Sequence, residues 1–159
     1  MNRRIAGVFL LLLLGLALFV SVYYLPLLIG DPEPYNETTV SVYDENGTFL
    51  STVDVRIAAD RVQQYVGLSE TDSLDVDSGM LFVHDDEDDR SYVMRGMSFD
   101  LDIIFVSGDG QITTIHHASA DSDDEFSGRG TYVLEVERGW ANETGVDTGD
   151  VVRIPDEYR

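Results

Sequence analysis

Residues 101–116 read LDIIFVSGDGQITTIH, and this run decides the class of fold that the sequence predicts. Residues 101–106 form a compact apolar run that only Asp102 interrupts. Gly108-Asp109-Gly110 then favours a chain reversal, because glycine and aspartate tolerate the backbone conformations of tight turns. Residues 111–116 can pair back on the first run. The stretch therefore predicts two neighbouring antiparallel strands joined as a β-hairpin.

Similar short runs lie on both sides of this hairpin. We expect further strands over residues 39–43, 50–57, 80–83, 91–95, 131–136 and 151–154. Two short helices are predicted over residues 60–66 and 139–144, each followed by a glycine that can end it. The acidic run 85–89 and the polar stretch 121–130 are expected to be loops. Many short strands with little helix predict a mainly β, α+β domain built as a small barrel-like rolled sheet.

The N-terminal segment has a different character. Residues 5–29 read IAGVFLLLLLGLALFVSVYYLPLLI, 25 residues without a charge, and a membrane-spanning helix needs about 20 apolar residues. Arg3 and Arg4 precede the segment, and basic residues favour the cytoplasmic side. The alternative is a cleaved signal peptide, whose apolar region would be shorter, about 7–15 residues. We expect a single transmembrane anchor in the lipid bilayer, with the N-terminus cytoplasmic and the C-terminal domain extracellular.

The sequence thus divides into three parts: an anchor over residues 1–30, a proline-containing linker over 31–38, and an acidic domain over 39–159. All 30 acidic residues but only eight of the ten basic residues follow residue 30, a net charge of −22. These like charges repel one another in dilute salt. In molar salt the screening length falls to about 3 Å, so the repulsion is largely removed. The composition indicates a salt-adapted prokaryote. It disfavours nucleic-acid binding, and the absence of cysteine excludes disulfides.

Three ordered blocks carry a resemblance to a known family. The first is Gly67-Leu68 followed by residues 79–83, GMLFV. The second is residues 92–95, YVMR, followed by residues 101–106 and 110–112. The third is residues 132–136, YVLEV, followed by residues 139–141, 145–146 and 149–152. Together they resemble the family called "domain of unknown function 192", over roughly residues 53–154.

The resemblance implies a small β-barrel-like α+β domain, often exported or tethered to a membrane, with no agreed activity. The chain departs from the family pattern at two places. Where the family usually has a Trp-Met-Lys-Asn-Thr-like stretch, this chain has residues 92–97, YVMRGM, so Gly96 replaces the usual asparagine. Where a Pro-Leu-Asp is usual, Asp100 replaces the proline.

Arg95 and Asp102 are the polar residues that stand out near the central hairpin. They lie in neighbouring predicted strands, and an arginine fork can hold a carboxylate through two hydrogen bonds. Asp102 adjoins an apolar run, where a carboxylate needs a partner if it is buried. The pair is interpreted either as a structural ion pair at the barrel rim or as part of a ligand pocket. The predicted ligand-binding set is Met94, Arg95, Asp100 and Asp102.

No metal site, cofactor or catalytic residue is assigned. His84, His116 and His117 lack the spacing of zinc ligands, and the acidic run 85–89 lacks the spacing of a calcium loop. Three Asn-x-Thr triplets begin at Asn36, Asn46 and Asn142, and each is a candidate glycosylation site on an external domain.

Three functional hypotheses follow. The first is a membrane-anchored, extracytoplasmic binding or accessory module of the cell envelope, which is more consistent with the sequence than an enzyme. The second is an envelope hydrolase that uses Arg95 and Asp102. The third is a structural partner of a membrane-protein complex, engaged through the anchor.

Overall fold

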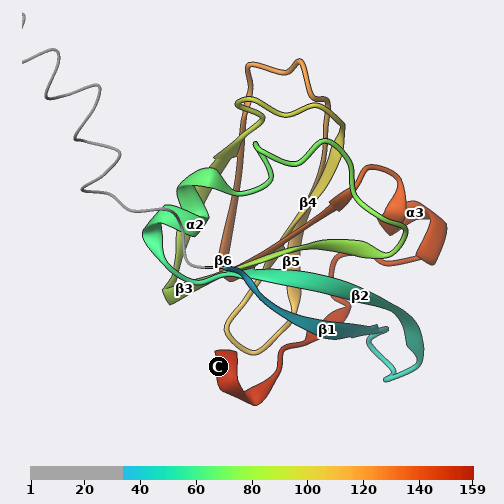
Figure 1. Ribbon diagram of the computed structural model, residues 1–159. Coiled ribbons are helices and arrows are strands. Elements are labelled where there is room, and N and C mark those ends of the chain that lie inside the picture. Colours follow the sequence, from blue (N-terminus) through green and yellow to red (C-terminus); the bar gives the residue numbers. More distant parts are fainter. Residues whose placement is uncertain (1–33) are drawn as a thin grey trace, which may run out of the picture. The chain divides into compact units, whose positions relative to one another are not determined.

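A seven-stranded curled sheet dominates the computed structural model, which describes residues 34–159 (Figure 1). The strand order is β5-β4-β6-β3-β2-β1-β7. The strands are β1 (Asn36–Tyr43), β2 (Phe49–Ala58), β3 (Ser78–Val93), β4 (Leu101–Val106), β5 (Ile112–Ala118), β6 (Glu125–Glu137) and β7 (Val151–Arg153). The helical elements are α2 (Arg61–Val66), α3 (Trp140–Thr144) and the 3-10 helix η1 (Asp156–Tyr158).

The two outermost strands of the sheet approach each other. β5 and β7 stand at opposite ends of the strand order, yet a bridge joins Gln111 to Val151. The backbone amide of Ile112 also donates to the carbonyl of Asp150 at 2.8 Å. The sheet therefore curls into a half-barrel, and the predicted mainly β, barrel-like fold with two short helices is confirmed.

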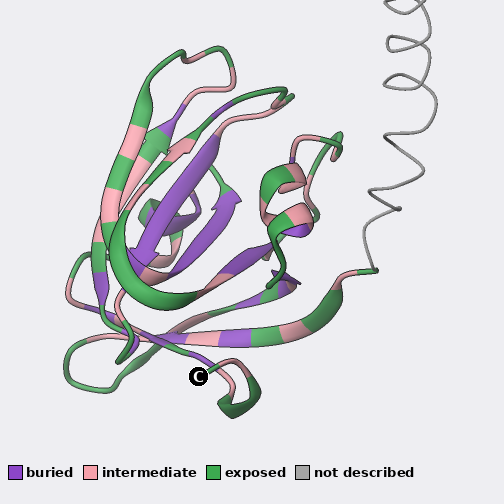
Figure 2. Ribbon diagram, turned by 90° about the vertical axis from the view of Figure 1, so that its left-hand side faces the viewer, coloured by how far each residue is buried: buried purple, intermediate pink, exposed green. Residues whose placement is uncertain are grey.

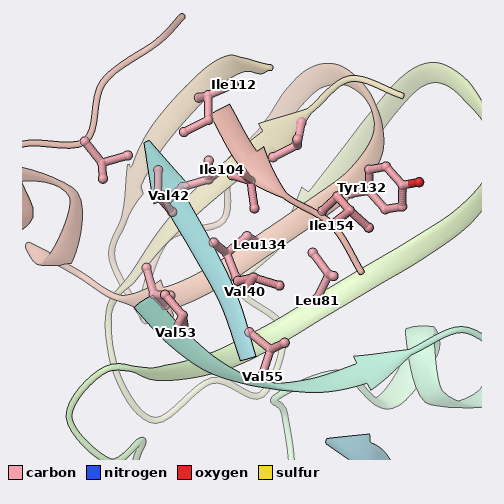
Figure 3. Packing of buried hydrophobic residues seen from close by; sticks show 14 of the residues in the cluster. Val40, Val42, Val53, Val55, Leu81, Ile104, Ile112, Tyr132, Leu134 and Ile154 are labelled. Atoms are coloured by element: carbon pink, nitrogen blue, oxygen red, sulfur yellow. The ribbon is translucent and has the colours of Figure 1, made fainter. Parts of the chain in front are cut away.

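The concave side of the sheet holds the first core cluster (Figure 3). Its side chains come from most strands and point toward one another; they include Val40, Val42, Val53, Val55, Leu81, Ile104, Ile112, Tyr132, Leu134 and Ile154. Alternation in the strands supplies them, since every second residue of a strand faces one side. Trp140 and Ala141 of α3 join the cluster, so this helix packs on the same side of the sheet.

A second core cluster occupies the other face of the central strands. It contains Ala58, Leu68, Met80, Phe82, Met94, Leu101, Ile103, Phe105, Ala118 and Val133. All six residues of β4 are buried, because the even-numbered apolar positions serve the first cluster and the odd-numbered positions the second. In Figure 2 the buried stretches lie in the middle of the sheet, and the ends of long strands and the loops are mostly exposed.

The long strands β3 and β6 correct two loop predictions. The acidic run 85–89 lies inside β3, and residues 125–130 of the predicted polar loop belong to β6. The two segments pair over residues 88–93 and 125–130, after a bulge between Val83 and Asp88. Contacts across the pair include an ion pair between Arg129 and Glu87 at 3.1 Å. Both segments are mostly polar and lack the alternation of polar and apolar residues that marks a half-buried strand. Their sequences therefore resemble loops.

The helices and turns follow the predicted local signals. Asp60 caps α2 in a capping box with Gln63, and Gly67 ends the helix. Gly145 ends α3 in the left-handed conformation. The first strand begins at Asn36, within the linker predicted for residues 31–38.

The predicted membrane segment, residues 5–29, lies outside the described residues. Among residues 34–159, no helix is long and apolar enough to span a bilayer.

Candidate functional site

A cavity of about 520 Å³ opens beside α2. Its walls come from α2 and the segment after it, from both halves of β3, and from residues of β4 and β6. The side-chain amide of Gln64 donates to the carbonyl of Val83 at 2.7 Å and ties α2 to β3. The volume lies in the range typical of small-molecule sites, about 300–1,000 Å³.

Glu135 is the most unusual group in the cavity wall. It lies in the middle of β6 and faces the second core cluster, as do its cross-strand neighbours Met80 and Ile103. Glu135 is only 6% exposed, and within residues 34–159 its carboxyl group has no hydrogen-bond partner and no ion pair. Burial raises its pKa from 4.5 to about 8, because an apolar environment disfavours the charged carboxylate. The carboxyl group is therefore largely protonated at neutral pH.

Tyr92 and His84 form a neutral pair in the same wall. The Tyr92 hydroxyl and the His84 Nε2 are 2.9 Å apart. Burial, and then the positive charge of Arg90, lower the pKa of His84 to about 4. Burial, and then the charge of Glu135, raise the pKa of Tyr92. Both groups are uncharged at neutral pH, so the interior of the cavity offers hydrogen-bonding groups without fixed charge.

Three arginines line the cavity. Arg95 donates from Nη2 to the carbonyl of Tyr65 at 2.9 Å, and its guanidinium lies 4.2 Å from the centre of the Tyr65 ring. Arg90 is held by the carbonyl of Gly130 and by Asp86. Arg61, the third, is exposed. A chain with so few basic residues thus gathers three of the eight in its folded domain around one cavity.

The structure separates the residues that the sequence grouped into one site. Arg95 lines the cavity, and Met94 is buried in the second core cluster and lines a smaller hollow with Arg95. The carboxyl group of Asp100 accepts from the amide of Ala120 at 2.9 Å and pairs with Arg138 at 3.3 Å. Ligand binding by these residues stays a prediction.

Asp102 faces the opposite side of the sheet and is fully buried. Its Oδ1 lies 2.6 Å from Nδ1 of His117, and its Oδ2 accepts from the amides of Gly139 and Ala141 at 3.1 and 3.0 Å. The prediction of an ion pair between Arg95 and Asp102 was therefore wrong. Strand alternation directs Asp102 toward α3 and away from the cavity. The carboxylate instead satisfies backbone amides at the start of α3.

Sequence reasoning missed Glu135. The signal was present, since Glu135 is the one charged residue in the predicted strand 131–136, where both neighbours are apolar. The three sequon asparagines, Asn36, Asn46 and Asn142, are all exposed, and their glycosylation remains a prediction. His116 contacts the carbonyl of Ser127 at 2.8 Å. No group of metal-ligating side chains gathers within residues 34–159.

These features define a small half-barrel domain with an acid-containing cavity, and two solved structures share that fold. One is a proposed transcription regulator from Sinorhizobium meliloti 1021, with 28% identity and a TM-score of 0.72 over 77% of this chain and 97% of that chain. The other is a protein of unknown function from Novosphingobium aromaticivorans DSM 12444, with 25% identity and a TM-score of 0.67 over 79% of this chain and 94% of that chain.

The family description DUF192, "Uncharacterized ACR", matches residues 41–154. The match covers more than half of the sequence, and the chain belongs to the DUF192 family. The resemblance inferred from the three sequence blocks is thereby confirmed. No curated protein gives a significant match.

Proposed function

We propose that this domain is a small-ligand-binding module and that the ligand occupies the cavity beside α2. The observation that carries the proposal is Glu135, a carboxyl group that is 6% exposed and lacks a hydrogen-bond partner within the described part of the chain. Among residues 34–159, the Tyr35 hydroxyl is the only fully enclosed side-chain polar atom without a partner, so the Glu135 carboxyl group reaches the cavity that it lines. A ligand in the cavity can bond to this carboxyl group directly.

Two exposed apolar side chains in the cavity lining support the same assignment. Tyr65 and Val93 are 69% and 54% exposed and belong to the few large apolar side chains that face solvent in the described domain. Both line this cavity. Aromatic and apolar groups around a few directed polar groups are typical of ligand sites.

Binding is tested by calorimetry on the full chain in detergent and molar salt, with a panel of sugars, amino acids, carboxylates and amines. At least one compound should bind, and Glu135→Gln should weaken its binding tenfold or more. Glu137→Gln is the matched control, since Glu137 is an exposed glutamate two residues further along the same strand. Absence of binding across the panel, or binding that ignores Glu135→Gln, would reject the proposal.

The hydrolase alternative depended on Arg95 and Asp102 acting together. Their separation onto opposite faces of the sheet gives no support to that mechanism. The third alternative, a structural partner in a membrane complex, depends on the anchor.

We further propose that residues 5–29 hold the domain on the outer face of the membrane of a salt-adapted cell. The uncharged run, the preceding arginines and the net charge of −22 after residue 30 support this. The full chain should stay with the membrane after alkaline extraction, whereas a chain lacking residues 2–30 should not. Protease added outside spheroplasts should degrade the domain; protection of the domain would reverse the assigned orientation.

A further inference from the structure

The cavity is lined by one acidic and one basic side chain that have no partner among residues 34–159. Glu135 is the acidic side chain, and it is buried. Arg61 lines the same cavity from the exposed surface of α2. Within residues 34–159, every other arginine has a hydrogen bond, an ion pair or an aromatic ring contact, and Arg61 has none. The cavity therefore presents an acid and a base that the fold leaves unsatisfied.

The acid, Glu135, has no positively charged partner among residues 34–159. No basic side chain bonds to Glu135, and the walls beside it include the rings of Phe82 and Tyr92, which are 5.1 Å apart at their centres. An ammonium group placed against a carboxylate favours ionisation of the carboxyl group, and aromatic faces attract cations.

The base, Arg61, is exposed and free to take an anionic partner. A guanidinium binds carboxylates through paired hydrogen bonds, and Arg61 is available for such a contact. A ligand with net negative charge would be repelled by a domain of net charge −22. A ligand that carries one charge of each sign has no net charge and avoids that repulsion. It can still bind both the Glu135 carboxyl group and the Arg61 guanidinium.

We propose that the cavity binds a zwitterionic ligand of the amino-acid class, with its ammonium group at Glu135 and its carboxylate at Arg61. This inference rests on the proposed ligand-binding function and specifies the chemistry of the ligand. The cavity volume of about 520 Å³ leaves room for an amino acid with a side chain or a longer carbon chain.

Binding of such a ligand should release a proton. Glu135 is mostly protonated in the free protein at pH 7, and an ammonium group at contact distance favours the carboxylate. The other titratable or charged groups facing this cavity from the surrounding elements are Arg61, Tyr65, His84, Asp89, Arg90, Tyr92 and Arg95. Of these, His84 and Tyr92 remain neutral near pH 7, so Glu135 is the source of the proton.

The test compares three compounds of equal chain length, 6-aminohexanoate, hexylamine and hexanoate, in calorimetric titrations of the full chain. Glycine and 4-aminobutyrate extend the series and report the distance between the two charges that the cavity prefers. We expect one of the amino acids to bind at least tenfold more tightly than hexylamine and hexanoate. Repeating the titration at pH 7 in buffers of different ionisation enthalpy should show release of about one proton.

Variants separate the two ends of the ligand. Glu135→Gln should weaken amino-acid binding at least tenfold and abolish proton release, and Arg61→Gln should weaken amino acids while sparing hexylamine. Glu137→Gln should change neither. Hexanoate binding as tightly as the amino acids, or unchanged proton release in Glu135→Gln, would overturn the assigned ligand class. If uncharged compounds of the wider panel bind through Glu135 and amino acids do not, the ligand class fails and the binding function stands; if nothing binds, both fail.

Discussion

At the scale of single residues, burial in the cavity wall changes the protonation state of Glu135 at neutral pH. Its carboxyl group is buried because Glu135 lies on the face of β6 that the second core cluster covers. The pKa of about 8 means that the folded protein retains a proton that the unfolded chain loses above pH 4.5. Stability must therefore depend on pH through this residue.

Glu135→Gln should remove that dependence. Below pH 4.5 the carboxyl group is protonated in both the folded and the unfolded state, and the wild-type protein then has the full stability this group allows. As pH rises toward 8, the unfolded chain ionises first, and the wild-type free energy of unfolding falls by up to about 1.4 kcal/mol per pH unit. The stability of the variant relative to wild type should therefore increase between pH 5 and pH 8.

The measurement is denaturant unfolding of the full chain in molar salt, followed by circular dichroism at several pH values. Glu137→Gln should run parallel to wild type, because that side chain is exposed at the end of the strand. A constant difference between Glu135→Gln and wild type across this pH range would contradict the raised pKa.

At the scale of elements, the two short helices have separate tasks. α2 forms a wall of the cavity, while α3 packs through Trp140 and Ala141 on the first core cluster. The two helices lie on opposite sides of the sheet in Figure 1. Asp102 connects β4 to the start of α3, so changes at Asp102 should affect stability without reaching the cavity.

Asp102→Asn tests this connection. The buried carboxylate accepts two backbone amides and contacts His117, and an amide group supplies only one acceptor oxygen. Leaving buried donors unpaired should lower the free energy of unfolding by about 2–4 kcal/mol. Asp100→Asn is the control, because its ion pair with Arg138 is half exposed, and such pairs contribute about 1 kcal/mol or less. A variant at Asp102 with wild-type stability would refute the capping role.

The β3–β6 strand pair is tested by Gly128→Ala. A β-carbon at Gly128 would lie 2.5 Å from the ring of Phe105, which is fully buried in β4. The ring would have to move, and such overpacking costs about 1–3 kcal/mol. Gly108→Ala provides the comparison, since its nearest neighbour is the Thr131 hydroxyl at 3.2 Å. Unfolding free energies of the two variants should differ clearly, with Gly108→Ala close to wild type.

At the scale of the whole molecule, the net charge predicts how stability depends on salt concentration. The chain after residue 30 carries a net charge of −22. The screening length falls from about 10 Å at 0.1 M salt to about 3 Å at 1 M. Repulsion between carboxylates on the folded surface is therefore much weaker in concentrated salt.

The melting temperature of the full chain should rise from 0.1 to 2 M KCl. A variant with Asp85, Asp121 and Asp123 changed to asparagine should be less sensitive to salt, because these exposed aspartates make no hydrogen bond or ion pair within the described domain. Melting temperatures of both proteins over the salt series check this. An equal salt response in the two proteins would show that the repulsion of surface carboxylates is not the cause.

The sequence alone determined the local elements whose signals are short-range. Residues 101–106 were predicted as a strand with the bounds observed for β4, and Asp60 and Gly67 marked the start and end of α2. The family could also be recognised from the sequence, because its ordered blocks are compared residue by residue without knowledge of tertiary contacts. The net charge needed only counting.

Tertiary structure decided which of these residues meet. The pairing of residues 88–93 with 125–130 joins two polar stretches that look like loops when each is considered separately. Arg95 and Asp102 appear close in sequence, yet the alternation of side chains across the sheet sends Asp102 to His117 and leaves Arg95 at the cavity. Glu135 became a candidate only when a second layer covered its face of β6. Local patterns report the conformation of a segment, whereas burial depends on which distant segment lies against it, and only the folded sheet specifies that.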